Sequence, residues 1–296
     1  MGGSYEVAAA GRFAPSPTGP LHLGSLLAAT ASYLDARAHG LNWQVRLDDL
    51  DQPRNQPGAE QAILLALERH GLLWDGPVSR QSENGAHYAA ALSSLAEQGL
   101  LFYCRCSRKQ LAAHAVYPGT CRAHRQARSD AAIRVRVDEE VIEFDDLVLG
   151  PQREALDRSG GDFVVRRRDG IVAYQLATAV DDGNPGITRV IRGRDLLENT
   201  PRQIYLMRRL GLAVPVYGHI PLLVNTAGQK LSKQTGARPL DLDRPEENLT
   251  QILRALGIAP KQGNAGFRGC AALLSEALAA WSLEGIPRND TVANRE

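Results

Sequence analysis

The feature that most constrains the fold is the segment from Arg12 to Ser25, which reads Arg-Phe-Ala-Pro-Ser-Pro-Thr-Gly-Pro-Leu-His-Leu-Gly-Ser. Its prolines lack amide donors and Gly19 can adopt positive φ, so the segment is expected to be a loop. The short apolar run 11–14 predicts a strand, and the Leu- and Ala-rich stretch 26–38 predicts a helix. A strand, a tight loop and a helix N-terminus together form a typical anion site.

Two residues of this loop suit a nucleotide ligand. His22 places a hydrogen-bond donor at the mouth of the loop, and Gly24 has no Cβ, so a flat ring can approach the backbone. The alternative is an ordinary strand-to-helix turn with an incidental histidine, because short motifs often match by chance.

The next segments alternate between strand and helix patterns. A strand is predicted over 42–47, and helices are predicted over 58–70 and 87–98. Each helix is followed by a glycine, Gly71 or Gly99, which suits a helix C-terminus. This alternation predicts a parallel sheet with covered faces, a doubly wound α/β nucleotide fold.

The pattern is interrupted and then resumes. Strand-like stretches at 133–137 and 141–149 are assigned to an insert, and residues 171–180 return to the nucleotide fold. Thr200 is expected to cap a helix that begins at Pro201. We therefore divide the chain into four segments: 1–103, the first half of the catalytic domain; 104–160, the insert; 161–240, the second half; and 241–296, a short helical C-terminal appendix.

Three of the four cysteines lie within eighteen residues of one another, at Cys104, Cys106 and Cys121. In a chain without an export signal, such clustering favours a metal site over disulfides. Zinc in a structural site takes four ligands, and the fourth could be His114, Tyr117 or His124. The alternative is three free thiols in a loop.

Charge is distributed unevenly along a nearly neutral chain. The net charge is +1, but six Arg and Lys residues and no acid lie between Cys104 and Ser129, and Arg166-Arg167-Arg168 extends this basic run. A polyphosphate backbone is the natural partner of such a run, although a solvated surface is the simpler explanation.

The composition also excludes several classes of protein. The N-terminal residues do not resemble a secretory signal, and no apolar run approaches the about 18 residues of a membrane span. We therefore expect a cytoplasmic protein without membrane association, acting as a monomer.

Two remote segments together resemble the paired signatures of the class I aminoacyl-tRNA synthetases. They are His22-Leu23-Gly24-Ser25 and Lys230-Leu231-Ser232-Lys233-Gln234. Within this class, the sequences of residues 12–19, 166–177 and 190–193 resemble the glutamyl branch in particular. Ser25 is a departure, because many members carry a second histidine there, but its hydroxyl can still donate a hydrogen bond.

The resemblance implies a Rossmann-like catalytic domain and roles for individual residues. It implies that L-glutamate is bound by Arg12, Ala14, Ser16, Asp48, Tyr174 and Arg192, that ATP is bound with Mg²⁺ by His22, Gly24, Ser25 and Lys233, and that His22, Lys230 and Lys233 assist catalysis. The family usually carries Glu where this chain has Asp48, so the shorter side chain is expected to reach the substrate ammonium through a water or with help from Asp49.

The cysteine segment resembles the zinc knuckle of the glutamyl-queuosine tRNA(Asp) synthetases, in which a tyrosine is the fourth ligand. The resemblance therefore implies one structural Zn²⁺ per chain, held by Cys104, Cys106, Tyr117 and Cys121. We also expect no long anticodon-binding region in this chain. The resemblance to this family implies activation of glutamate without RNA and transfer to the queuosine base of tRNA(Asp).

Three alternatives remain at this point. The first is a compact enzyme that charges the terminal adenosine of tRNA(Glu), and the second is a catalytically silent RNA-binding module. The third is a small-molecule adenylyltransferase, which would not be expected to carry the lysine segment.

Overall fold

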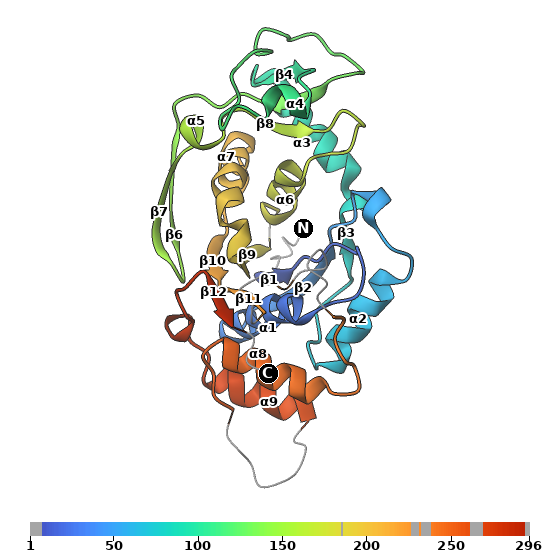
Figure 1. Ribbon diagram of the computed structural model, residues 1–296, viewed down its shortest axis with the longest axis vertical. Helices are drawn as coiled ribbons and strands as arrows, with labels where there is room; N and C mark the ends of the chain where they lie inside the picture. The colour runs from blue at the N-terminus through green and yellow to red at the C-terminus, as the bar shows by residue number, and fades with distance from the viewer. Residues whose placement is uncertain (1–7, 185, 226–230, 232–237, 261–268, 294–296) are drawn as a thin grey trace, which may run out of the picture.

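A computed structural model of the chain describes residues 8–184, 186–225, 231, 238–260 and 269–293. A seven-stranded sheet lies at its centre (Figure 1). In the order in which they pair, its strands are β3 (Ser79–Arg80), β2 (Asn42–Leu47), β1 (Ala10–Phe13), β9 (Ile187–Gly193), β10 (Val216–Ile220), β6 (Val141–Asp146) and β7 (Gly150–Ala155). Neighbouring strands from β3 to β6 are parallel, and only β7 is antiparallel to its neighbour. The predicted parallel sheet is therefore confirmed.

Helices cover both faces of this sheet. The helices formed by the described residues are α1 (Leu23–Ala38), α2 (Ala59–Arg69), α3 (Gly85–Glu97), α4 (Arg108–Leu111), α5 (Leu156–Ser159), α6 (Tyr174–Asp182), α7 (Thr200–Leu210), α8 (Pro245–Ala255) and α9 (Gly269–Ala279). Short 3₁₀ turns are formed by Gln52–Arg54, Gln81–Asn84, Arg194–Asn199 and Leu283–Gly285. None of the helices in the described part of the chain is both long enough and apolar enough to cross a membrane.

Two separate buried clusters pack on the two faces. One contains apolar residues of α1, α2, α8 and α9, and the other contains residues of α3, α6 and α7. Neighbouring residues of β9 illustrate the division, because Ile191 belongs to the first cluster and Val190 to the second. Since successive side chains of a strand point to opposite faces, a strand buried on both faces needs apolar residues at consecutive positions.

Residues 104–160 contribute to two different sheets. Strand β5 (Ala132–Val135) forms a three-stranded antiparallel sheet with β4 (Leu101–Cys104) and β8 (Phe163–Arg166). The hairpin β6–β7 instead continues the central sheet beyond β10. In Figure 1 the small sheet lies at the opposite end of the molecule from α8 and α9.

The C-terminal part is not an independent unit. Helices α8 and α9 pack against α1 and share its buried cluster. Strand β12 (Thr291–Ala293) pairs in parallel with β11 (Leu222–Val224), a pairing that the sequence did not predict. The prediction that residues 241–296 form a helical appendix is therefore wrong at Thr291–Ala293, which form a strand.

Two helix boundaries differ from the sequence-based prediction. Helix α1 begins at Leu23, three residues early, because the side chain of His22 caps it. Thr200 is already in helical conformation and does not cap α7; Asn199 occupies that position without a side-chain bond. The Thr200 hydroxyl instead accepts a hydrogen bond from Arg192. The Thr200 hydroxyl therefore bonds to the buried Arg192 instead of capping the helix.

Candidate active site

A cavity of about 520 Å³ opens at the carboxyl ends of β1, β2, β9 and β10. This edge is where open parallel α/β sheets bind ligands, and the volume lies in the range of small-molecule sites. Nine of the predicted site residues line the cavity, namely Arg12, Ala14, Ser16, His22, Gly24, Ser25, Asp48, Tyr174 and Arg192. Lys230 and Lys233 lie outside the described residues, but Leu231 between them also lines the cavity.

Ser25 holds the imidazole of His22. The Ser25 N–H donates to His22 Nδ1 over 3.2 Å, and the Ser25 hydroxyl lies 3.2 Å from His22 Nε2. Because Nδ1 accepts, a neutral ring carries its proton on Nε2. The serine at this position thus fixes the tautomer of the histidine at the N-terminus of α1.

Protein atoms also approach Gly24 closely. A Cβ at this position would lie 3.0 Å from the carbonyl oxygen of Leu231. Leu231 is held there by donation of its N–H to the Leu223 carbonyl over 2.8 Å. The backbone that approaches Gly24 most closely therefore belongs to the residue between the two lysines in sequence.

An ion cluster lies along one wall of the cavity, to which its members Arg12 and Asp48 contribute. Arg12 makes two parallel bonds of 3.0 and 2.5 Å to Asp182, and Arg46 Nη1 donates to the same carboxylate over 2.6 Å. Asp182 is fully buried. Burial alone would raise its pKa, but the two guanidinium groups lower the pKa well below its ordinary value. Asp182 is therefore a carboxylate at neutral pH.

Two further carboxylates leave this wall with an excess of negative charge. Asp48 accepts from Arg46 Nε over 2.8 Å. Asp181 accepts hydrogen bonds from the neutral side chains of Gln81, Asn84 and Tyr88 and lies 3.7 Å from Arg46 Nε. Counted by formal charges, the two guanidinium groups and three carboxylates of the cluster sum to −1. Burial raises the pKa of Asp48, although Arg46 opposes the shift. This wall is complementary to a cation.

The opposite charge lies on Arg192 at the end of β9. Its side chain is buried, and its guanidinium donates to His219 Nε2 over 3.1 Å and to Thr200 Oγ1 over 2.6 Å. The ring of Tyr217 lies 5.0 Å from its guanidinium carbon. Within the described residues Arg192 has no ion pair with a carboxylate, and its Nη1 has no hydrogen-bond partner. A buried cation without a counter-ion is costly, so this position favours an anionic ligand.

Several of these residues were missed by sequence reasoning. They are Arg46, Asp146, Asp181, Asp182, Thr200 and His219. One usable signal was present, since Asp181 and Asp182 follow directly on the apolar residues of α6. The role of His219 depends on strand pairing, which no local pattern reveals.

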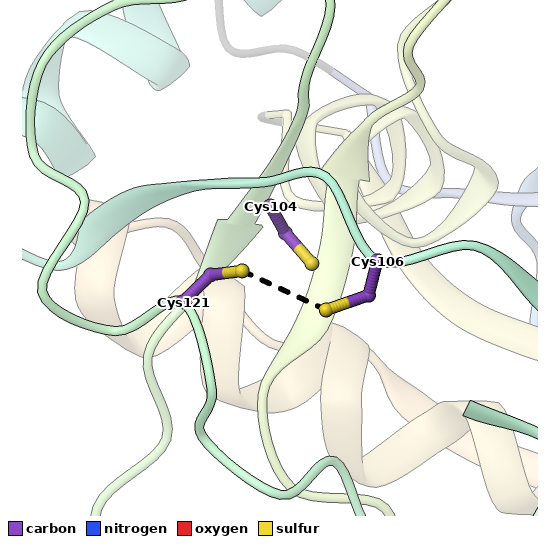
Figure 2. Close-up of side chains that lie close together, drawn as sticks. All are labelled: Cys104, Cys106 and Cys121. Atoms are coloured by element: carbon purple, nitrogen blue, oxygen red, sulfur yellow. Dashed lines mark hydrogen bonds between the residues drawn. The ribbon is translucent and has the colours of Figure 1, made fainter. Parts of the chain in front are cut away.

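The three clustered cysteines are brought together as predicted (Figure 2). Their Sγ atoms lie within 4.8 Å of one another and point toward a common centre, with Cys106 and Cys121 3.6 Å apart. Tetrahedral zinc–thiolate bonds of about 2.3 Å place ligand atoms about 3.8 Å apart, so the thiols fit this geometry. Tyr117 Oη lies 3.4 Å from Cys104 Sγ. Neither His114 nor His124 belongs to this group of close ligand atoms among the described residues.

A second cavity of about 300 Å³ lies beside the three-stranded sheet. Its lining includes Tyr103, Arg128 and the arginines 166–168. Arg166 and Arg168 bond only to backbone carbonyls in this part of the structure. Arg167 also reaches Asp51, three residues after Asp48. This basic cavity therefore adjoins the loop that follows β2.

The sequence and the fold are similar to those of known proteins. Residues 9–272 match the family described as "tRNA synthetases class I (E and Q), catalytic domain". The crystal structure of a glutamate tRNA ligase from Elizabethkingia meningosepticum has the same fold, with a TM-score of 0.80 at 24% identity, covering 97% of this chain and 67% of that one. The chain thus contains the catalytic domain of a class I aminoacyl-tRNA synthetase.

Closer relatives define the branch. The Glutamyl-Q tRNA(Asp) synthetase of Pseudomonas aeruginosa is 52% identical over 283 residues, which are 95% of this chain and 96% of that protein. The protein of the same name from Thiobacillus denitrificans is 50% identical over 294 residues, 97% of each chain. The chain belongs to the glutamyl-Q tRNA(Asp) synthetase family.

The ion cluster yields a prediction about stability. Asp182→Asn keeps the size of the side chain but leaves Arg12 and Arg46 buried without this carboxylate, so the free energy of unfolding should fall by roughly 3–5 kcal/mol. Urea denaturation measures the change. Because the pKa of Asp182 is lowered on folding, its contribution should be present above pH 3.8 and disappear as the pH falls.

A matched control uses an exposed pair. Asp138→Asn breaks an ion pair with Arg136 in which both side chains are largely exposed, so stability should change by at most about 1 kcal/mol. Equal losses in the two variants would contradict a structural role of the buried cluster.

Proposed function

We propose that the chain activates L-glutamate with ATP in the absence of tRNA and transfers the glutamyl group to the queuosine base of tRNA(Asp). The observation that carries the first half is Arg192, a buried guanidinium that lines the cavity and has no carboxylate partner among the described residues. The second half is supported by the names of relatives that are about half identical to the chain over nearly its full length.

Glutamate fits the charge distribution of the cavity in one orientation. Its γ-carboxylate supplies the missing counter-ion of Arg192, and its α-ammonium lies toward Asp48 and the excess negative charge beside it. Glutamine offers a neutral amide to the same guanidinium and therefore leaves that charge unpaired. Arg12, Ala14, Ser16 and Tyr174 complete the walls of the glutamate site.

Activation needs no protein nucleophile because glutamate supplies one. An oxygen of its α-carboxylate attacks the α-phosphorus of ATP, the bond from that phosphorus to the bridging oxygen breaks, and pyrophosphate leaves with its Mg²⁺. The protein must position both substrates and stabilise the charge on the leaving group. We assign this task to His22 with Gly24 and Ser25 at the start of α1, and to Lys230 and Lys233 of the lysine segment.

Transfer completes the reaction. A hydroxyl of the queuosine base attacks the activated carbonyl carbon, the bond from that carbon to the phosphate oxygen of AMP breaks, AMP leaves, and the hydroxyl proton passes to solvent. The basic cavity beside the three-stranded sheet suits the RNA, because Arg166 and Arg168 present guanidinium groups without described carboxylate partners. We accordingly assign RNA contacts to residues 104–160 and to this adjoining strand end.

The cysteine cluster is proposed to hold one structural zinc ion through Cys104, Cys106, Tyr117 and Cys121. The spacing of the thiols and the nearby phenol oxygen support this ligand set. Tyr117 Oη also accepts from the Cys121 N–H over 3.0 Å, which orients the phenol toward the thiols. Such an ion would fix the loop between β4 and β5, and it takes no part in the chemistry.

Pyrophosphate exchange tests the activation step. The protein should exchange labelled pyrophosphate into ATP with glutamate but not with glutamine, in the absence of any tRNA. Lys233→Ala should lower this rate by roughly 10²–10³-fold, because a cation facing the leaving group acts mainly in the transition state. Exchange at the parent rate in the variant would contradict the role of the lysine segment, and no exchange in the parent would indicate a silent module.

Transfer of radiolabelled glutamate tests the acceptor. Queuosine-containing tRNA(Asp) should be labelled, whereas queuosine-free tRNA(Asp) and tRNA(Glu) should not. Label on the terminal adenosine of tRNA(Glu) would instead identify a compact charging enzyme.

Metal analysis tests the cysteine cluster. The parent should contain one zinc per chain, and chelation or Cys121→Ser should remove it and lower the melting temperature, because structural zinc stabilises the fold. Cys270→Ser is the control, since Cys270 lies alone in α9, and it should keep the metal. Equal melting temperatures with and without chelator would contradict the proposal.

A further inference from the structure

Three buried polar side chains behind the cavity form a continuous chain of hydrogen bonds. His219 Nδ1 donates to Asp146 Oδ2 over 2.5 Å, and His219 Nε2 accepts from Arg192 Nε over 3.1 Å. The side chains of Asp146 and His219 are both fully buried. None of these bonds involves the walls that hold Asp48 and Asp182.

The central sheet creates this alignment from three adjacent strands. Arg192 on β9 and His219 on β10 are direct partners in the strand register, so their side chains lie on the same face. Asp146 ends β6, which pairs with β10 through Tyr217. The hairpin that interrupts the nucleotide fold in sequence thus supplies a carboxylate behind the glutamate site.

The state of the imidazole follows from Asp146 and Arg192, the charged partners of its two nitrogens, and Thr200 Oγ1 also lies 3.0 Å from Nε2. Asp146 Oδ1 accepts backbone N–H groups of Val148, Leu149 and His219 over 3.0, 2.9 and 3.2 Å, so the carboxylate is anchored as an acceptor. It therefore takes the proton of Nδ1, and the lone pair of Nε2 faces Arg192. Burial and the nearby Arg192 charge lower the pKa of His219 despite Asp146, which agrees with a neutral ring.

The placement of a neutral imidazole has two consequences for Arg192. The His219 imidazole accepts from Arg192 Nε, and Thr200 accepts from Arg192 Nη2. These two bonds fix the plane of the guanidinium. The imidazole also separates Arg192 from Asp146, so that the carboxylate cannot form a direct ion pair with the guanidinium. The positive charge remains for a ligand, with Nη1 as a nitrogen that lacks a described partner.

We propose that His219 and Asp146 are positioning residues that orient Arg192 toward the side-chain carboxylate of the amino-acid substrate and so set the selectivity for glutamate over glutamine. This inference rests on the proposed glutamate activation. It assigns the two residues no contact with substrate.

Exchange kinetics test this role. His219→Phe keeps a ring of similar size but removes the hydrogen bonds of the imidazole, so the KM for glutamate should rise roughly 10- to 100-fold, the range for a lost bond to a charged group. The KM for ATP and kcat at saturating glutamate should change by less than about 3-fold. The preference for glutamate over glutamine should fall together with the affinity.

Two further variants separate positioning from packing. His219→Gln carries both an acceptor and a donor and should recover much of the glutamate KM, whereas Asp146→Asn should raise the KM because its amide can present a donor to the imidazole. If His219→Phe and His219→Gln raise the KM for glutamate and for ATP equally, the residue has only a structural role and the proposal is wrong.

A measurement on the parent protein covers the case in which variants do not fold. Nitrogen NMR of ¹⁵N-histidine-labelled protein should show His219 with a protonated Nδ1 and an unprotonated Nε2. A proton on Nε2 would overturn the proposal. Absence of glutamate-dependent exchange in the parent would instead contradict the proposed function, so the two failures are distinguishable.

Discussion

The structure depends on the partners of the buried arginine side chains at the carboxyl edge of its central sheet. Arg12 and Arg46 are neutralised by carboxylates of the protein itself, chiefly Asp182, whereas Arg192 is held by His219 and Thr200, which carry no formal charge when the imidazole is neutral. Because a buried ion without its partner is costly, the first arrangement is a permanent part of the fold and the second is a receptor for an anion. The same cavity thus presents an excess of negative charge on one wall and a positive charge on another, as a zwitterionic acid with an anionic side chain requires.

Topology explains why these groups meet. In a parallel sheet the ends of neighbouring strands lie on one edge, so Arg12, Asp48 and Arg192 are brought to one cavity although they are far apart in sequence. The hairpin β6–β7 extends this edge, and through Asp146 it connects the interrupting segment to the glutamate site. The glycine at position 24 likewise joins distant parts, because it admits the backbone of Leu231 beside the histidine loop.

Local sequence patterns and the family resemblance predicted individual strands and the residues of the cavity. The strand over 42–47 agrees with β2, and the nine described residues assigned to glutamate and ATP all line one cavity. Sequence reasoning did not find Asp182 or His219, because the partners of a buried charge are chosen by tertiary packing. For the same reason Thr200 was misjudged: its hydroxyl suits a helix cap, but a buried arginine within reach binds it instead. The pairing of β11 with β12 could not be predicted from local sequence patterns either, because it joins segments almost seventy residues apart.

The most direct test is a crystal structure of the protein with L-glutamate bound. We predict that the γ-carboxylate lies within hydrogen-bond distance of the Arg192 guanidinium and that the α-ammonium lies beside Asp48, directly or through one water. Glutamate bound in the reverse orientation, or bound without contact to Arg192, would contradict it.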